Sequence, residues 1–149
     1  MSHTKIWIYQ SSRQFSDTEA SEIKQKAMEF IAQWQAHGST LTSSMELMYN
    51  RFIVFSVNEQ YVRASGCSID SSIAFIKSLE QGYNIDLLDR MQVAFRNKEA
   101  IETLPLASFR ELLKSGKIKD DTIVFNNLVT TKEEFDRAWE IPVKESWIP

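Results

Sequence analysis

Two apolar runs constrain the fold of this chain more than any other feature. Residues 6–9 read Ile-Trp-Ile-Tyr, and residues 52–57 are apolar at every position except Ser56. Strands that are apolar on both faces lie inside a sheet whose two faces are covered. Residues 41–49 and 91–96 instead alternate apolar and polar side chains, as strands with one wet face do. The sequence therefore predicts two central strands and two edge strands.

Helical patterns separate these strands. Ser16 and Glu19 form a capping box, and Gly38 is expected to end the helix that follows. A second helix is expected to begin at Ser68 as its N-cap and to run to about residue 81. Each helix carries an apolar stripe at helical spacing, formed by Ile23, Ala27, Phe30, Trp34 and His37 in the first and by Ile69, Ile73, Ile76 and Leu79 in the second.

The resulting order, β-α-β-β-α-β, predicts an α+β fold, namely a ferredoxin-like split β-α-β sandwich over residues 1–100. Both helices are expected to cover one face of its four-stranded sheet, with strands one and three in the centre. Residues 101–149 form a C-terminal α/β extension with a helix at 106–115, a strand at 122–125 and a capping box from Thr131 to Glu134. We expect this extension to pack on the core in one compact domain, with a homodimer as the alternative cover for the open face of the sheet.

Composition narrows the class of protein. The 149 residues carry a net charge of -3, with Lys and Arg scattered among Asp and Glu, which argues against a nucleic-acid or membrane surface. No apolar run approaches the roughly 20 residues that a membrane span needs, and the N-terminus lacks the apolar core of a signal peptide. One cysteine excludes an internal disulfide, and one cysteine with two histidines predicts no metal site and no cofactor. The expectation is a cytoplasmic protein.

The start of the second helix is the first candidate site. Ser65, Gly66, Cys67 and Ser68 crowd small residues, hydroxyls and the only thiol into the entry of this helix. Unpaired N–H groups and the positive end of the helix dipole favour an anion at such a position. The segment therefore predicts a site for a small anionic ligand, although the same residues also serve ordinary helix capping.

A cysteine and a histidine form the second candidate. The predicted topology brings the end of the first helix, with His37, to the end of the sandwich where the second helix starts with Cys67. Such a pair is suited to nucleophilic catalysis, with Asp70 orienting the imidazole. The alternative is that Cys67 and His37 are simply packed residues on apolar surfaces.

Three arginines form the third candidate. Arg13, Arg51 and Arg90 follow or precede strands at the opposite end of the predicted sandwich. Converging guanidinium groups bind carboxylates or phosphates in a bidentate way. The alternative is a solvated rim on which they pair with Glu46, Asp86 and Asp89.

The sequence contains no recognised catalytic motif. A phosphate loop would need a glycine at Glu111 and a hydroxyl at Ile118 around the Gly116-Lys117 pair, so a Walker-type ATPase is excluded. Zinc-protease and serine-hydrolase motifs do not occur either. Whether the chain is an enzyme is left open by its residues.

Several segments resemble a family of small uncharacterised bacterial proteins of about this length. The most specific of them is Ala-Ser-Gly-Cys-Ser-Ile-Asp-Ser-Ser at residues 64–72, accompanied by segments at 7–11, 34–38, 49–52 and 122–128. The resemblance covers nearly the whole chain. It implies no particular activity and no catalytic residues.

Three functions are compatible with these observations. The first is a non-catalytic cytoplasmic domain that binds a small anionic ligand or a protein partner at the start of the second helix. The second is a cysteine-dependent enzyme or thiol redox sensor that uses Cys67 with His37. The third is a structural subunit that assembles into homo-oligomers.

Overall fold

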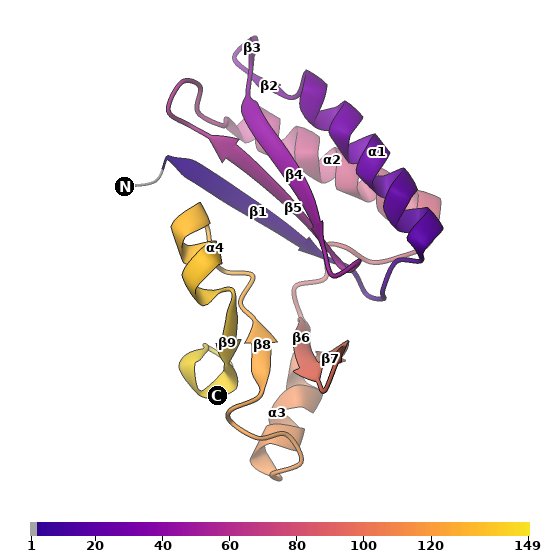
Figure 1. The fold of residues 1–149 in the computed structure, drawn as a ribbon, viewed down its shortest axis with the longest axis vertical. Helices are drawn as coiled ribbons and strands as arrows, with labels where there is room; N and C mark the ends of the chain where they lie inside the picture. The colour runs from indigo at the N-terminus through magenta and orange to yellow at the C-terminus, as the bar shows by residue number, and fades with distance from the viewer. Residues whose placement is uncertain (1–2) are drawn as a thin grey trace. The chain divides into compact units, whose positions relative to one another are not determined.

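The computed structural model describes residues 3–149, which divide into two compact units. Unit 1 comprises residues up to Leu88 together with residues 130–133, and unit 2 comprises residues 89–129 and 134–149. Both units mix helices with antiparallel strands, which confirms the α+β class (Figure 1). Along the chain, the first change from unit 1 to unit 2 falls after Leu88.

Unit 1 is a three-stranded antiparallel sheet covered on one face by two helices (Figure 1). Its strands are β1 (Thr4–Gln10), β4 (Thr42–Met48) and β5 (Phe52–Asn58), in the order β1-β5-β4. The helices are α1 (Asp17–Gln33) and α2 (Gly66–Tyr83). β5 is central, as its apolar sequence predicts, and its burial is nearly continuous from residue 52 to residue 57.

Local sequence explains the ends of α1. Ser16 caps its start, because the Ser16 hydroxyl accepts the N–H of Glu19 and the Glu19 carboxylate accepts the N–H of Ser16. The helix ends at Gln33, four residues before His37, and a small hairpin follows from β2 (Gln35–Ala36) to β3 (Ser39–Thr40). His37 and Gly38 form the turn with φ of 52° and 79°. Positive φ at two successive residues is typical of a two-residue hairpin turn. The predicted extension of the helix to His37 is therefore wrong.

The aromatic core of unit 1 lies between the sheet and the helices. Phe55, fully buried on β5, has ring contacts with Phe30 and Trp34 from α1 and its C-cap and with Phe75 from α2. Tyr9 of β1 packs edge-on against Phe55 and shares a buried hydrogen bond of 3.0 Å with the hydroxyl of Ser72 in α2. These contacts fix both helices over the same face of the sheet.

The predicted four-stranded sheet does not form in unit 1. Residues 92–97 are strand β6 (Gln92–Asn97), which pairs in unit 2 with β7 (Ala100–Pro105) across a two-residue turn. Closing this short hairpin costs less chain entropy than pairing residue 92 with the distant β1. β1 is consequently an outer strand of its sheet, and on its free side Lys5 forms a single antiparallel bridge with Thr131.

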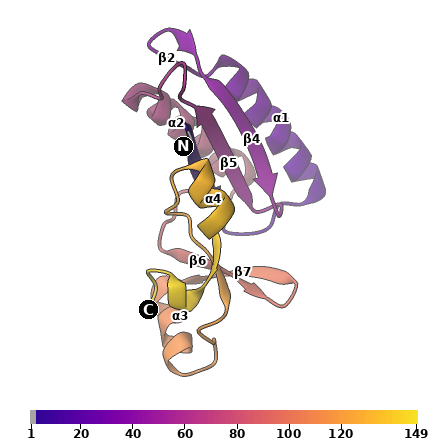
Figure 2. The same cartoon turned by 60° about the vertical axis from the view of Figure 1, so that its left-hand side comes forward.

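Unit 2 contains a four-stranded antiparallel sheet in the order β7-β6-β8-β9 (Figure 1), and Figure 2 shows the β6–β7 hairpin from another side. It adds β8 (Ile123–Phe125), β9 (Glu140–Pro142), α3 (Leu106–Lys114) and the 3-10 helix η1 (Val143–Glu145). α4 (Lys132–Ala138) begins in unit 1 and ends in unit 2. In unit 2, β6, α3, β8 and α4 match predicted elements, whereas β7, β9 and η1 were not predicted. Its core is formed by Val93, Phe95, Phe109, Val124, Val143 and Ile148.

Candidate functional site

The end of α1 and the start of α2 meet through one buried hydrogen bond. The indole Nε1 of Trp34 donates to the carbonyl oxygen of Ser68 at 2.8 Å. Trp34 is the C-cap of α1, and Ser68 lies in the first turn of α2. The two ends therefore lie together as the topology predicted, and Trp34 makes the connection in place of His37.

Ser65, and not Ser68, caps α2. The Ser65 hydroxyl accepts the N–H of Ser68 at 3.1 Å, while the Ser68 hydroxyl accepts the N–H of Ser65 at 2.7 Å. Ser68 is buried and Ser65 is half-buried. The chain thus enters the helix three residues earlier than predicted, because two serines at this spacing form a reciprocal capping box.

The first turn of α2 leaves two backbone donors exposed to a ligand. Gly66 and Cys67 are exposed, and within residues 3–149 neither N–H donates a hydrogen bond. The Cys67 thiol is free. Of the four predicted ligand-binding residues, Gly66 and Cys67 present open groups, whereas Ser65 and Ser68 are used for capping.

The predicted catalytic group is not assembled. His37 lies at the tip of the β2–β3 hairpin, and its side chain is exposed, as is that of Asp70 in α2. Among the residues that the structure describes, no hydrogen bond joins His37, Cys67 and Asp70. A nucleophile held by its base, and a base held by an orienting carboxylate, are therefore not formed here.

A hollow of about 580 Å³ lies between α1 and α2, one helical turn from Cys67. Phe30, Trp34 and Phe75 give it an aromatic floor, in which the rings of Phe30 and Phe75 stack at 4.8 Å. The rim is polar and is formed by Lys26, Glu29, Gln33, Gln35 and Ser71. The combination of an aromatic floor with a few polar groups is typical of small-ligand sites.

Ser71 contributes a short, exposed side chain to the rim of this hollow. Its hydroxyl donates to the carbonyl of Cys67 at 3.0 Å and is thereby held against its own helix. Four residues separate Cys67 from Ser71, so the two lie on the same face of α2. Sequence reasoning placed Phe30 on the apolar stripe but missed the hollow, because its walls come from two segments about forty residues apart.

The arginine cluster is only partly formed. Arg13 and Arg51 both contact the loop after β1, but Arg90 belongs to unit 2. Arg51 is buried and donates to the carbonyls of Ser11 and Ser12 at 3.4 and 3.0 Å. Through these bonds its guanidinium supports the loop after β1.

Arg13 is paired with a carboxylate that was not foreseen. Its guanidinium donates two hydrogen bonds of 2.8 Å to the carboxylate of Glu19, the acidic residue of the α1 capping box. The bond from Arg13, reinforced by the Ser16 N–H, lowers the pKa of Glu19 to about 2, and the same contact raises the pKa of Arg13. None of the predicted partners Glu46, Asp86 and Asp89 makes this ion pair.

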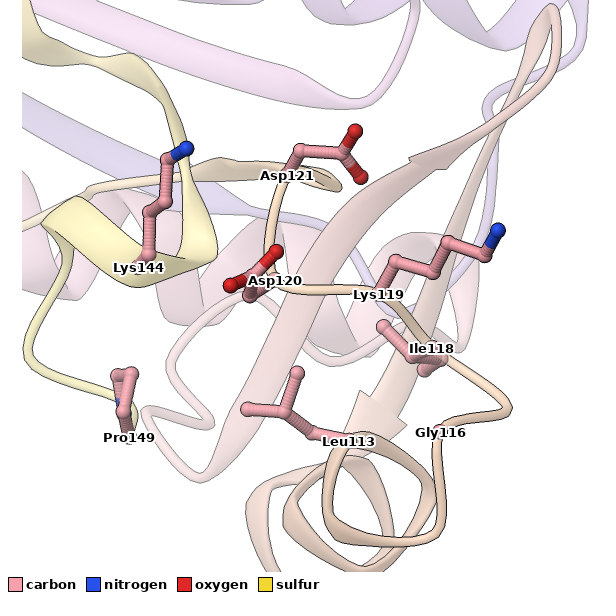
Figure 3. A pocket seen from close by; sticks show the side chains of 8 residues that line it. All are labelled: Leu113, Gly116, Ile118, Lys119, Asp120, Asp121, Lys144 and Pro149. Carbon is pink, nitrogen blue, oxygen red and sulfur yellow. The ribbon is translucent and has the colours of Figure 1, made fainter.

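A second hollow, of about 590 Å³, lies in unit 2 after the end of α3 (Figure 3). It has an aliphatic part formed by Leu113 and Ile118, and four charged side chains line it: Lys119, Asp120, Asp121 and Lys144. No sequence pattern predicts this hollow, because its charged residues follow a helix and have no periodic spacing.

Within residues 3–149 no cluster of three or more metal-ligating side chains occurs, and no helix there is long and apolar enough to cross a membrane. Comparison of the chain with known protein families, curated proteins and solved structures finds no match.

Proposed function

We propose that unit 1 is a non-catalytic domain that binds a small ligand in the hollow between α1 and α2. The observation that carries the proposal is the position of this hollow, whose aromatic floor reaches the first turn of α2 through Trp34. A ligand with a flat apolar part would cover Phe30 and Phe75. An anionic group on the same ligand would reach the open N–H groups of Gly66 and Cys67.

The proposal is tested with 2-naphthoate, a flat aromatic carboxylate, and with its uncharged amide. Two-dimensional NMR should show that 2-naphthoate shifts the indole N–H signal of Trp34 and the amide signals of Gly66 and Cys67, and that the neutral amide binds more weakly. Ser71→Trp should abolish binding because the indole fills the hollow. Ser78→Trp is the matched control, since Ser78 is also an exposed α2 serine bonded to its own helix but does not line the hollow.

Two results would count against the proposal. One is an absence of shifts at these three positions at millimolar 2-naphthoate. The other is equal loss of binding in the Ser71→Trp and Ser78→Trp proteins. If a protein bound at this surface and 2-naphthoate did not, the small-ligand proposal would be wrong. The alternative from the sequence analysis, a protein-binding domain, would then take its place.

A second candidate function is a cysteine-dependent enzyme or thiol redox sensor. It is favoured by the exposure of Cys67 at the second position of α2. The pH dependence of alkylation tests it: a midpoint well below the free-thiol value of about 8.5 would support a functional thiol. The His37→Ala variant tests the pairing, and an alkylation rate unchanged by this substitution would remove His37 from the mechanism.

We further propose that unit 1 is a ferredoxin-like arrangement without its fourth strand. Support comes from the strand order β1-β5-β4, from the two helices on one face, and from Thr131, which bridges β1 in antiparallel orientation where a fourth strand would lie. We also propose that the chain belongs to the family of small bacterial proteins that its segments resemble. A cytoplasmic location is proposed as well, and the free thiol of Cys67 supports it. A homo-oligomeric subunit is the remaining alternative, and sedimentation equilibrium measures it directly.

A further inference from the structure

β4 is an outer strand of the unit 1 sheet, and within residues 3–149 no strand or bridge pairs with its outer side. The other outer strand, β1, is covered: the N–H of Ile6 donates to the carbonyl of Thr130 at 2.9 Å, and Lys5 forms a bridge with Thr131. The seven residues of β4 contain no lysine, no proline and no bulge, which are the features that usually block an open edge. The outer side of β4 is therefore suited to pairing with another strand.

α1 lies beside this edge and exposes one apolar side chain there. The Ser43 hydroxyl of β4 donates to the carbonyl of Ile31 at 3.4 Å, and α1 runs alongside β4 (Figure 1, Figure 2). Phe30 faces α2, which covers the β1 side of the sheet, and its ring stacks on that of Phe75. Met28 is two residues earlier, a rotation of about 200° around the helix, so it points away from α2 and towards the edge of β4. Met28 is 49% exposed.

Met28 also lies near the middle of this edge. α1 runs antiparallel to β4, because Asp17 at its start accepts a hydrogen bond of 3.5 Å from the Asn50 side chain, just beyond the end of β4. From the Ser43 contact at the other end, Met28 lies about 4.5 Å back along α1 and Met45 about 7 Å along β4. Met28 and Met45 are therefore at nearly the same level.

The sequence of β4 is complementary to a second copy of itself. If residues 42–48 pair antiparallel with the same residues of another chain, Met45 lies on the two-fold axis and Glu46 lies opposite Ser44 of the partner subunit. A hydroxyl would then donate to a carboxylate, in two symmetric contacts. An axis through Glu46 would instead oppose two like charges, which disfavours that register. The axis at Met45 also brings Met28 next to its own copy, so that two exposed methionines cover each other.

We propose that two copies of the chain associate through their β4 strands. The strands form a continuous six-stranded sheet, with the two α1 helices side by side on one face. This contact uses the edge of the sheet, whereas the homodimer considered from the sequence used its open face. The hollow of unit 1 lies on the other flank of α1, between α1 and α2, so dimerisation leaves it open. The two proposals therefore stand or fall separately.

Sedimentation equilibrium of the full chain measures the association. We expect a dimer that forms as the concentration rises from micromolar to millimolar. Amide hydrogen exchange should slow in β4 over the same range, whereas exchange in β7, an outer strand of the other sheet, should not change. A monomer at millimolar concentration would overturn the proposal, and so would a dimer whose β4 amides exchange as fast as those of the monomer.

Charge substitutions at Ser44 test the register. Ser44→Lys puts an ammonium group opposite Glu46 of the partner subunit and should tighten the dimer about tenfold, whereas Ser44→Glu should weaken it about tenfold. Ser78→Lys and Ser78→Glu are the matched controls, since Ser78 is also an exposed serine but lies in α2, away from this edge. Equal shifts in dimer affinity at both positions would show only an effect of net charge and would refute the contact.

Met28→Glu tests the contact between the helices. It opposes two carboxylates across the two-fold axis and should weaken the dimer about tenfold, while glutamate keeps a high preference for the helix. Ser78→Glu is again the control. A dimer affinity unchanged by Met28→Glu would overturn the placement of α1 at the interface.

Discussion

Trp34 and Ser68 are 34 residues apart in the sequence, and the indole of the first donates to the carbonyl of the second in a buried bond of 2.8 Å. The exposed fraction of Trp34 is 2% and that of Ser68 is 1%. This contact closes one end of the layer formed by α1 and α2. It also places the aromatic floor of the unit 1 hollow beside the helix start that carries Cys67.

Replacing this indole should weaken the fold. Trp34→Phe removes the donor to Ser68 and part of the ring that packs on Phe55. We expect a loss of about 2 to 4 kcal/mol in the free energy of unfolding, measured by urea denaturation, from the lost hydrogen bond and the cavity together. Trp147→Phe is the control, since Trp147 is 44% exposed. Similar losses of unfolding free energy in both variants would show that the Trp34–Ser68 hydrogen bond does not contribute to stability.

The capping box of α2 predicts different effects for its serines and for a serine elsewhere in the helix. Ser65→Ala removes the acceptor for the Ser68 N–H and should cost about 1 kcal/mol. Ser78→Ala should change stability by only a few tenths of that amount, because Ser78 lies inside the helix and is exposed. Thermal unfolding followed by circular dichroism compares the two. If Ser65→Ala were as mild as Ser78→Ala, the cap would not stabilise the helix.

The Arg13–Glu19 pair predicts a dependence of stability on acid. The pKa of Glu19 is lowered to about 2 in the folded chain, compared with an ordinary value near 4.5. Its contribution to stability is therefore complete above about pH 4.5 and is lost as the pH falls towards 2. NMR titration of the Glu19 carboxyl should give a midpoint near 2 in the native chain.

The Arg13→Gln variant separates the effect of Arg13 on the pKa of Glu19 from the effect of the Ser16 N–H. Removal of the guanidinium should move the Glu19 midpoint upward, although the Ser16 N–H still holds it below its ordinary value. In Glu19→Gln, the part of the acid destabilisation that comes from this carboxyl should disappear. A Glu19 midpoint unchanged by Arg13→Gln would contradict the ion pair.

Two glycines should respond in opposite directions to alanine. Gly38 has φ of +79° in the β2–β3 turn, so Gly38→Ala should cost about 1 kcal/mol through backbone strain alone, since an added Cβ meets nothing within 4 Å. Gly82 lies inside α2 with equally open surroundings, so Gly82→Ala should stabilise the chain by about 0.5 to 1 kcal/mol. Urea denaturation measures the change in unfolding free energy for both variants. A change of the same sign in both would argue against the positive φ of Gly38 in the turn with His37.

Residue patterns alone were sufficient where neighbouring residues decide the structure. The apolar run at 52–57 predicted the central strand β5, and Ser16 with Glu19 predicted the start of α1. Both are confirmed because burial on two faces and capping depend on residues a few positions apart. The pair His37-Gly38 was misread as the end of a helix, although the same two residues also suit a two-residue hairpin turn.

Tertiary structure decided everything that required a choice between distant partners. An alternating segment such as residues 92–97 suits any sheet edge, and only the competition between nearby β7 and distant β1 assigned it to unit 2. The same holds for both hollows, whose walls come from segments that no periodicity links. The sequence determined which pieces of chain become helix or strand, because those preferences are local. The partners of those pieces, and the sites between them, followed from packing free energies that no single stretch of residues contains.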